Sequence, residues 1–69
     1  MKKILVLGST GMAGHLVALY FKENGYAVTG FSRREVNEFN SIIGDALDTQ
    51  FLKKTILNGE YDVLIVLVS

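Results

Sequence analysis

The chain has 69 residues, and its seven basic and seven acidic side chains cancel, so no overall field attracts nucleic acid or an anionic membrane. It has no cysteine for a disulfide, and its single histidine cannot build a metal site. Hydrophobic residues nevertheless make up 49% of it, which is the composition of a protein interior. A chain this short with so apolar a composition is expected to be a piece of a larger fold.

The start of the chain superficially resembles a signal peptide, because two lysines precede the apolar run at residues 4–7. That run is too short for the apolar region of a signal peptide, and no small-residue cleavage site follows it. The longest apolar stretch, residues 63–68, is also far shorter than the roughly 18 residues that a membrane span needs. We therefore expect a cytoplasmic protein with neither a membrane nor a nucleic acid as partner.

The first half of the chain reads as strand, helix and strand. Residues 4–7 are a continuous aliphatic run of the kind found in strands buried on both faces. A helix is expected from about residue 11 to residue 24, and Asn24-Gly25 ends it because glycine adopts the left-handed conformation that closes a helix. The helical spacing is carried by Met12, Leu16, Leu19 and Tyr20. A second strand is expected at residues 26–31, and residues 32–40 read as a polar loop.

The second half repeats the alternation. Residues 41–44 read as a short third strand, and Asp48 is expected to cap the amino end of a second helix. The apolar face of that helix is Phe51, Leu52, Ile56 and Leu57. Asn58-Gly59 is expected to end it as Asn24-Gly25 ends the first, and residues 63–68 form a wholly apolar fourth strand. Buried-type strands separated by helices predict an α/β fold with parallel strands joined by right-handed crossovers.

Three glycines at the junction of the first strand and the first helix carry the main functional signal. Gly8 would let the chain leave the strand in a tight turn, Gly11 would let the backbone approach a pyrophosphate, and Gly14 would let the helix pack closely on the sheet. The diphosphate would sit at the helix amino end, where free N–H groups and the helix dipole favour an anion, with hydroxyl help from Ser9 and Thr10. This pattern between a strand and a helix predicts a Rossmann-type dinucleotide-binding domain. The alternative is a structural turn that binds nothing.

The end of the second strand is the place where this fold distinguishes NAD from NADP. An Asp or Glu there selects NAD by accepting from the ribose 2′-hydroxyl, whereas a nearby Arg accommodates the 2′-phosphate of NADP. This chain has Ser32 followed by Arg33 and Arg34, and arginines form charge-assisted bonds to phosphate. The residues therefore favour NADP over NAD. The alternative is a solvated loop whose arginines pair with Glu35 or Glu38.

Two further groups of residues have both a functional and a structural interpretation. Asp45 could accept a hydrogen bond from the adenine amino group, with the Ala46 backbone beside it, or it could belong to a turn that only caps the next helix; both stay open. His15, next to the glycine motif, is expected to be a surface residue rather than an acid, a base or a phosphate contact. Core-edge packing, not catalysis, is expected for Tyr20, Tyr26 and Tyr61.

Several segments resemble a known family. Residues 3–15 resemble the opening of the extended short-chain dehydrogenase/reductases, with the dTDP-4-dehydrorhamnose reductase type of sugar-nucleotide reductases as the nearest branch. Residues 44–48 resemble that family's G-D-x-x-D segment, in which the first Asp contacts adenine, and residues 61–65 resemble its P-D-V-V-I entry to strand four. The resemblance implies that residues 1–69 are the N-terminal half of an NAD(P)-binding Rossmann domain with strand order 3-2-1-4 and helices on both faces. A sugar nucleotide would be the substrate only of a full-length relative.

The departures from the family pattern concern catalysis. The family leaves strand four through Asn and small residues, whereas residues 66–69 are Val-Leu-Val-Ser. Its catalytic Tyr-x-x-x-Lys has no counterpart, because the positions four residues after the three tyrosines hold Asn24, Gly30 and Ile65. We therefore expect the chain alone not to transfer hydride. A non-catalytic NAD(P)-binding or redox-sensing module, or a remnant without function, remains as an alternative.

The sequence thus predicts one cofactor-binding site and one exposed apolar edge strand. The expected cofactor-binding residues are Gly8, Thr10, Gly11, Met12, Gly14, Ser32, Arg33, Arg34, Asp45 and Ala46. With order 3-2-1-4, the strand at residues 63–68 would be an exposed apolar edge, which is a template for pairing with another copy.

Overall fold

Four strands form one parallel sheet in the order β3-β2-β1-β4, in a computed structural model that describes residues 2–8 and 11–67. The strands are β1 (Lys3–Leu7), β2 (Ala27–Ser32), β3 (Asn40–Ile43) and β4 (Val63–Val66). This is the α/β class and the strand order that the sequence predicts.

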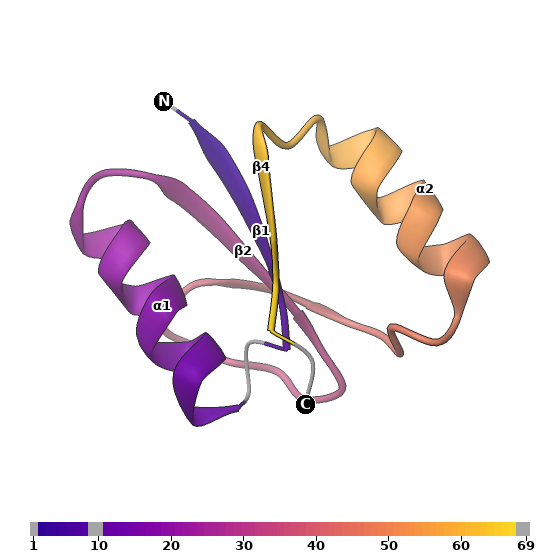
Figure 1. Ribbon diagram of the computed structural model, residues 1–69, viewed down its shortest axis with the longest axis horizontal. Coiled ribbons are helices and arrows are strands. Elements are labelled where there is room, and N and C mark those ends of the chain that lie inside the picture. Colours follow the sequence, from indigo (N-terminus) through magenta and orange to yellow (C-terminus); the bar gives the residue numbers. More distant parts are fainter. Residues whose placement is uncertain (1, 9–10, 68–69) are drawn as a thin grey trace.

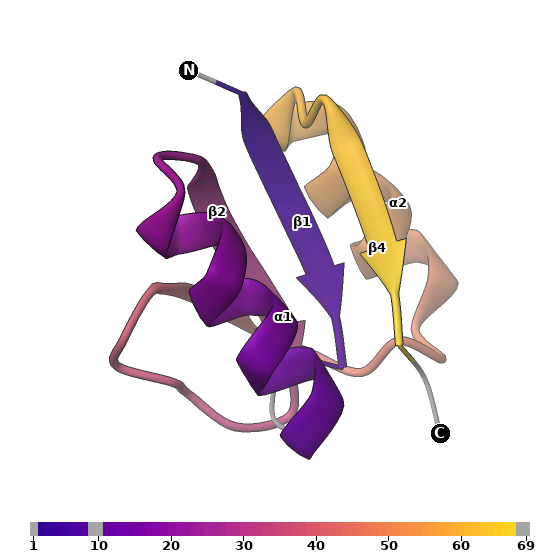
Figure 2. The same ribbon diagram turned by 60° about the vertical axis from the view of Figure 1, so that its left-hand side comes forward.

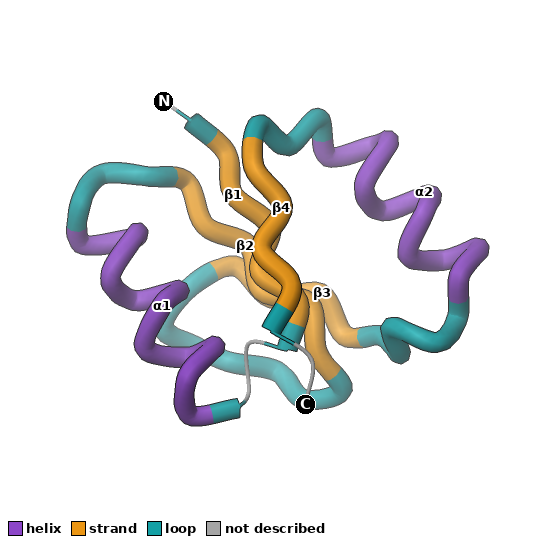
Figure 3. The backbone as a smooth tube through the Cα atoms, in the orientation of Figure 1, coloured by secondary structure: helices purple, strands orange, loops and turns teal. Residues whose placement is uncertain are grey.

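One helix covers each face of the sheet. Helix α1 (Met12–Glu23) follows β1, and helix α2 (Thr49–Gly59) follows β3. The two helices lie on opposite sides of the strands (Figures 1 and 2). The connection from β2 to β3 is a loop without a helix (Figure 3), so each face of the sheet carries a single helix.

The core has two halves separated by the sheet. Below α1, Ile4 and Val6 pack with residues of the helix and of β2, and the members of this cluster are Ile4, Val6, Ala18, Val28 and Phe39. On the α2 side the cluster is Leu5, Leu7 and Phe31, with Leu52 and Ile56 of the helix packed against it. Side chains alternate along a strand, so β1 supplies both halves of the core. Its four aliphatic residues are at most 4% exposed, which confirms a strand buried on both faces.

Helix α1 turns Gly14 and Ala18 to the sheet, and its Leu19 and Phe21 are half-buried against the same core cluster. Gly14 and Ala18 are the buried residues of the helix, whereas Met12, Leu16 and Tyr20 are 83%, 61% and 63% exposed. Of the four apolar residues that carry the predicted helical spacing, Leu19 packs against the core and the other three are exposed, because the small residues let the helix backbone lie close to the strands. The prediction that Tyr20 packs at the edge of the core is therefore wrong.

Two of the three expected helix-end features are present. Asp48 caps α2 by accepting from the amide of Phe51 at 3.3 Å, and Gly25 closes α1 with φ of +86°. The exception is Gly59, because Glu60 takes the left-handed conformation (φ of 50°) and Gly59 remains inside the helix. The lack of a side chain at Gly59 serves packing instead: a Cβ there would lie 2.1 Å from the ring of Tyr61. Tyr61 and Tyr26 are half-buried against the two core clusters, as expected.

The boundaries of the elements differ slightly from those expected. The second and third strands lie one residue away from the expected 26–31 and 41–44, because Ser32 and Asn40 join the β2–β3 ladder through backbone groups whatever their side chains are. The fourth strand, expected at 63–68, ends at Val66, where its partner β1 also ends. Helix α1 is one residue shorter at each end than expected.

Candidate functional site

A hollow of about 700 Å³ lies where the chain leaves the carboxyl ends of β1, β2 and β3. Its lining comes from the glycine turn, the loop after β2, the loop after β3 and the end of β4: Gly8, Gly11, Phe31, Ser32, Arg33, Arg34, Gly44, Asp45, Ala46, Leu47 and Leu67. In open parallel sheets, ligands bind outside the carboxyl ends of the strands, and this volume is typical of a small-molecule site.

The glycine turn forms one wall of the hollow. Gly8 leaves β1 with φ of +84°, a conformation that favours glycine, and its amide donates to the carbonyl of Phe31 at 3.0 Å. Gly11 is the N-cap of α1 and has an ordinary extended backbone, with φ of −68° and ψ of 155°. Gly14 is buried in α1, as its predicted packing role requires. The predicted contacts of Ser9 and Thr10 lie outside the described residues.

In the described part of the chain, no side chain caps the positive pole at the amino end of α1. Gly11 provides no side-chain cap, and the first turn contains no acidic residue. The backbone N–H groups of Met12, Ala13 and Gly14 therefore have no acceptor within the helix. Met12 is 83% exposed and is not among the lining residues of the hollow, so its contact with a cofactor stays a prediction. An anion placed here would meet free N–H donors and a favourable dipole.

Ser32 is a buried residue at the carboxyl end of β2. It is 7% exposed, and its hydroxyl donates to the carbonyl of Arg34 at 2.7 Å. A serine hydroxyl has one hydrogen, so Ser32 offers further groups in the hollow only a hydrogen-bond acceptor. It also holds the loop so that Arg33 and Arg34 begin at the rim of the hollow.

The arginines do not pair with the neighbouring glutamates. Arg33 Nη2 lies 3.6 Å from Asp45 Oδ1, across the gap between the β2 and β3 loops. The alternative pairing with Glu35 or Glu38 is therefore wrong for Arg33, because adjacent strand ends bring Asp45 closer than the chain's own loop does. Within residues 2–8 and 11–67, Arg34 makes no ion pair.

Asp45 forms the turn that leads to α2. Its Oδ1 accepts from the amide of Leu47 at 2.9 Å, and its carbonyl accepts from the amide of Asp48 at 2.9 Å. The structural interpretation of Asp45 is thus present, and its carboxylate also lines the hollow beside Ala46. Contact with adenine stays a prediction.

Sequence reasoning missed four residues of the lining, which are Phe31, Gly44, Leu47 and Leu67. Leu47 is an apolar side chain that is 81% exposed in the turn after β3, and an apolar residue directly after Gly-Asp-Ala was the available signal. Leu67 comes from the end of β4, and no local pattern places that strand beside the glycine turn. Phe31 is a core residue that also reaches the lining.

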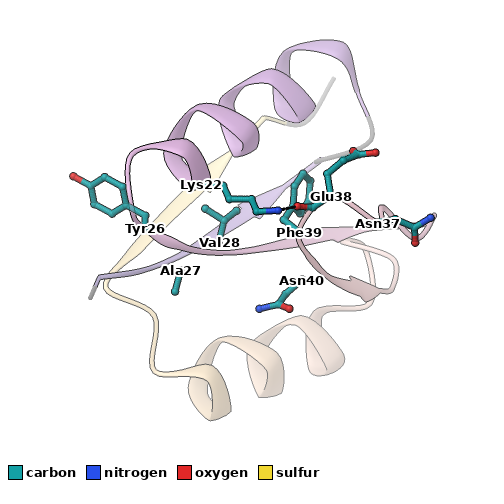
Figure 4. Close-up of a pocket in the computed structure, with 8 residues that line it drawn as sticks. All are labelled: Lys22, Tyr26, Ala27, Val28, Asn37, Glu38, Phe39 and Asn40. Atoms are coloured by element: carbon teal, nitrogen blue, oxygen red, sulfur yellow. Dashed lines mark hydrogen bonds between the residues drawn. The ribbon is translucent and has the colours of Figure 1, made fainter.

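A second hollow, of about 380 Å³, lies near the amino end of β2 and shares no lining residue with the first. Figure 4 shows Lys22 of α1 reaching across it to the backbone carbonyl of Glu38. The side chain of Glu38 pairs with His15 Nε2 at 3.0 Å, and Phe39 is buried beside it. These contacts fasten the β2–β3 loop to α1. His15 is 34% exposed and has a structural partner in Glu38.

Two structural features are absent from the described part of the chain. No group of three or more His, Cys, Asp or Glu side chains there is placed to hold a metal ion. None of the described helices combines the length and the apolar character that crossing a membrane requires.

Solved structures share this fold. The enzyme WbmH from Bordetella bronchiseptica, crystallised in complex with NAD⁺, superposes with a TM-score of 0.84 at 19% identity, over 100% of this chain and 26% of that one. A candidate epimerase from Burkholderia cenocepacia J2315 gives 0.83 at 21% identity, over 99% and 25%. A candidate exported protein from Burkholderia pseudomallei gives 0.83 at 26% identity, over 100% and 32%. The chain thus spans about a third or less of these proteins.

A search of curated proteins gave no match. The model of the NAD dependent epimerase/dehydratase family, in contrast, matches residues 4–69, which is nearly the whole chain and includes the glycine turn and all four strands but for Lys3. The fold, the position of the hollow and this match agree, and the chain belongs to the NAD dependent epimerase/dehydratase family.

Proposed function

We propose that this chain binds a nicotinamide dinucleotide, NADP in preference to NAD, as the cofactor-binding portion of a sugar-nucleotide reductase of the dTDP-4-dehydrorhamnose type. The pyrophosphate would lie against Gly11 and the amino end of α1, the adenosine ribose against residues 32–34, and adenine beside Asp45 and Ala46. The family's NAD dependence and the NAD⁺ complex of WbmH support a dinucleotide as the ligand. The sugar nucleotide would be contacted by parts of a full-length relative.

The observation that carries the proposal is the glycine at position 11. Its backbone conformation is open to any residue, and among the described residues a Cβ there would meet only the carbonyl oxygen of Gly8, at an ordinary contact distance of 3.5 Å. Neither backbone strain nor packing against the described residues therefore requires a glycine. Gly11 lines the hollow, beside N–H groups of the first turn of α1 that have no acceptor within the helix. Close approach of a pyrophosphate explains the residue.

The preference for NADP rests on the residues after β2. No carboxylate stands at the carboxyl end of that strand, and two exposed arginines follow Ser32. A 2′-phosphate is a dianion that arginine binds through charge-assisted hydrogen bonds. Ser32 retains only acceptor capacity, so the arginines have to supply the donors.

Titration of the Gly11→Ala variant with NADPH and NADH tests the site. We expect about a tenfold or larger loss of affinity for both cofactors, because a steric block of about 1.4 kcal/mol corresponds to that factor. The fold should persist, since the added Cβ meets no close atom of the chain. Gly25→Ala is the matched control: it strains a residue at φ of +86°, far from the hollow, so it should lower stability and leave affinity unchanged. Unchanged affinity in Gly11→Ala would contradict the proposed site.

The same titration tests the choice of cofactor. Wild-type chain should bind NADPH more tightly than NADH, and Arg33→Ala and Arg34→Ala should each reduce the difference. Equal binding of the two cofactors, or binding of neither, would refute the NADP assignment.

A non-catalytic NAD(P)-binding or redox-sensing module is the second candidate. Within these 69 residues, no tyrosine is followed four residues later by lysine, and none lines the hollow. Oxidation of NADPH by the chain in the presence of a dTDP-4-dehydro sugar would exclude this candidate. Tight cofactor binding without turnover would agree both with a module and with the cofactor-binding portion of a longer reductase.

A further inference from the structure

Arg33 and Asp45 form an ion pair at the rim of the 700 Å³ hollow, at the position proposed for the 2′-phosphate. β2 and β3 are neighbours in parallel register, with Ser32 opposite Ile43, and the amide of Gly44 extends the pairing by donating to the carbonyl of Ser32 at 2.9 Å. The next residues on the two loops, Arg33 and Asp45, therefore face each other, with 3.6 Å between Nη2 and Oδ1.

The two partners are held unequally. Asp45 Oδ1 also accepts from the amide of Leu47 at 2.9 Å, so the turn fixes the carboxylate in place. The Arg33 side chain is 74% exposed, against 48% for Asp45, and in the described part of the chain it has no other charged partner. Arg33 is thus the movable member, and its long side chain can leave Asp45 for another anion at the same rim.

From this geometry we infer that Asp45 is a specificity-determining residue that weakens the preference for NADP over NAD by competing with the 2′-phosphate for Arg33. The inference rests on the proposed function. A phosphate monoester at that position brings close to two negative charges. It gains Arg33 only as the Asp45 contact opens, and it then lies near a carboxylate that stays in place. A dinucleotide with a free 2′-hydroxyl has no such competition.

The competition predicts an asymmetric effect of removing the carboxylate. In Asp45→Asn the amide oxygen can still accept from Leu47, so the turn is retained while the charge is lost. Any contact of Asp45 with adenine is common to both cofactors and cancels in their ratio. The ratio of NADPH to NADH affinity should rise about fivefold, which is the factor that the upper end of an exposed ion pair converts to.

The experiment measures dissociation constants for two ligand pairs that differ only in the 2′-phosphate: NADPH with NADH, and adenosine 2′,5′-bisphosphate with adenosine 5′-monophosphate. Asp45→Asn should raise the ratio in both pairs, and in an Arg33→Gln background the same change should leave only the smaller gain from reduced repulsion. Glu35→Gln is the matched control, because it removes the same charge from the loop that carries Arg33, at an exposed residue without an ion pair in the described structure.

Each outcome decides a different point. A ratio that stays unchanged in Asp45→Asn, while both cofactors bind, overturns the competition and leaves the proposed function intact. An equal rise in Glu35→Gln overturns it too, because general charge would then explain the effect. Wild-type chain that binds none of the four ligands overturns the proposed function together with this inference.

Discussion

Replacing Gly59 by alanine sets two effects against each other. Alanine in a helix is favoured over glycine by about 0.5–1 kcal/mol. The new methyl group, however, would lie 2.1 and 2.5 Å from two atoms of the Tyr61 ring, which is closer than carbon atoms approach. The ring of Tyr61 therefore has to move. The net change in the free energy of unfolding depends on the contacts that the ring loses.

Tyr61 leaves two favourable contacts when its ring moves. The ring packs against the cluster of Leu5, Leu7 and Phe31, and the Lys3 ammonium lies 5.4 Å from its centroid. Losing a third of a ring's buried area costs about 1.5 kcal/mol, and losing an exposed cation–π contact costs about 0.5–1 kcal/mol. The loss exceeds the helical gain, so Gly59→Ala should destabilise the chain by about 1 kcal/mol.

Urea unfolding followed by far-ultraviolet circular dichroism measures this difference in stability. Repeating the measurement in a Tyr61→Leu variant shows whether the tyrosine ring causes it. In Tyr61→Leu the shorter side chain leaves room for the methyl group, so there Gly59→Ala should stabilise the chain by about 0.5 kcal/mol. Gly25→Ala, destabilised by its φ of +86°, should cost the same in both backgrounds. Stabilisation by Gly59→Ala in the wild-type background would refute the packing argument.

Two further predictions concern the site and the edge of the sheet. Ser32→Ala removes the 2.7 Å hydrogen bond to the Arg34 carbonyl, and thermal unfolding should show a loss of about 1 kcal/mol; unchanged stability would mean that this bond does not hold the loop. We also propose that copies of the chain associate through β4, where Leu64 and Val66 are 45% and 55% exposed and residues 63–67 carry no charge. Leu64→Lys should reduce association in sedimentation experiments, because a charge on an edge strand opposes pairing, and a wild-type chain that sediments as a monomer at high concentration would contradict the proposal.

The sequence predicts those features that depend on short stretches of chain. Aliphatic runs mark the strands, and β1 is buried on both faces as its uninterrupted run indicates. The Asp48 cap and the Gly25 terminus are also local, since each involves groups within four residues. The parallel order follows from the alternation of strands and helices, because a crossover connection favours one topology.

Features that depend on distant neighbours are not predicted. The pattern of α1 does not indicate which face packs, and small residues at 14 and 18 place Met12 and Leu16 in solvent. The partner of Arg33 is Asp45, twelve residues away, because strand pairing outweighs closeness in sequence. The sequence predicts that Gly59 ends the second helix, whereas in the structure its missing side chain makes room for the ring of Tyr61.

The chain contains its own comparison between a strand–helix turn suited to an anion and one that is not. α1 and α2 both follow parallel strands, but Asp48 supplies α2 with a carboxylate at its amino end, whereas Gly11 leaves that of α1 without one. Gly11→Asp would install the missing cap in a backbone conformation that N-caps adopt, so stability should rise by about 0.5–1 kcal/mol. The same carboxylate would occupy and repel the position proposed for the pyrophosphate, so binding of NADPH and NADH should be lost together. Because the two effects have opposite signs, loss of binding could not be ascribed to unfolding, and retained binding would show that the amino end of α1 is not where the dinucleotide lies.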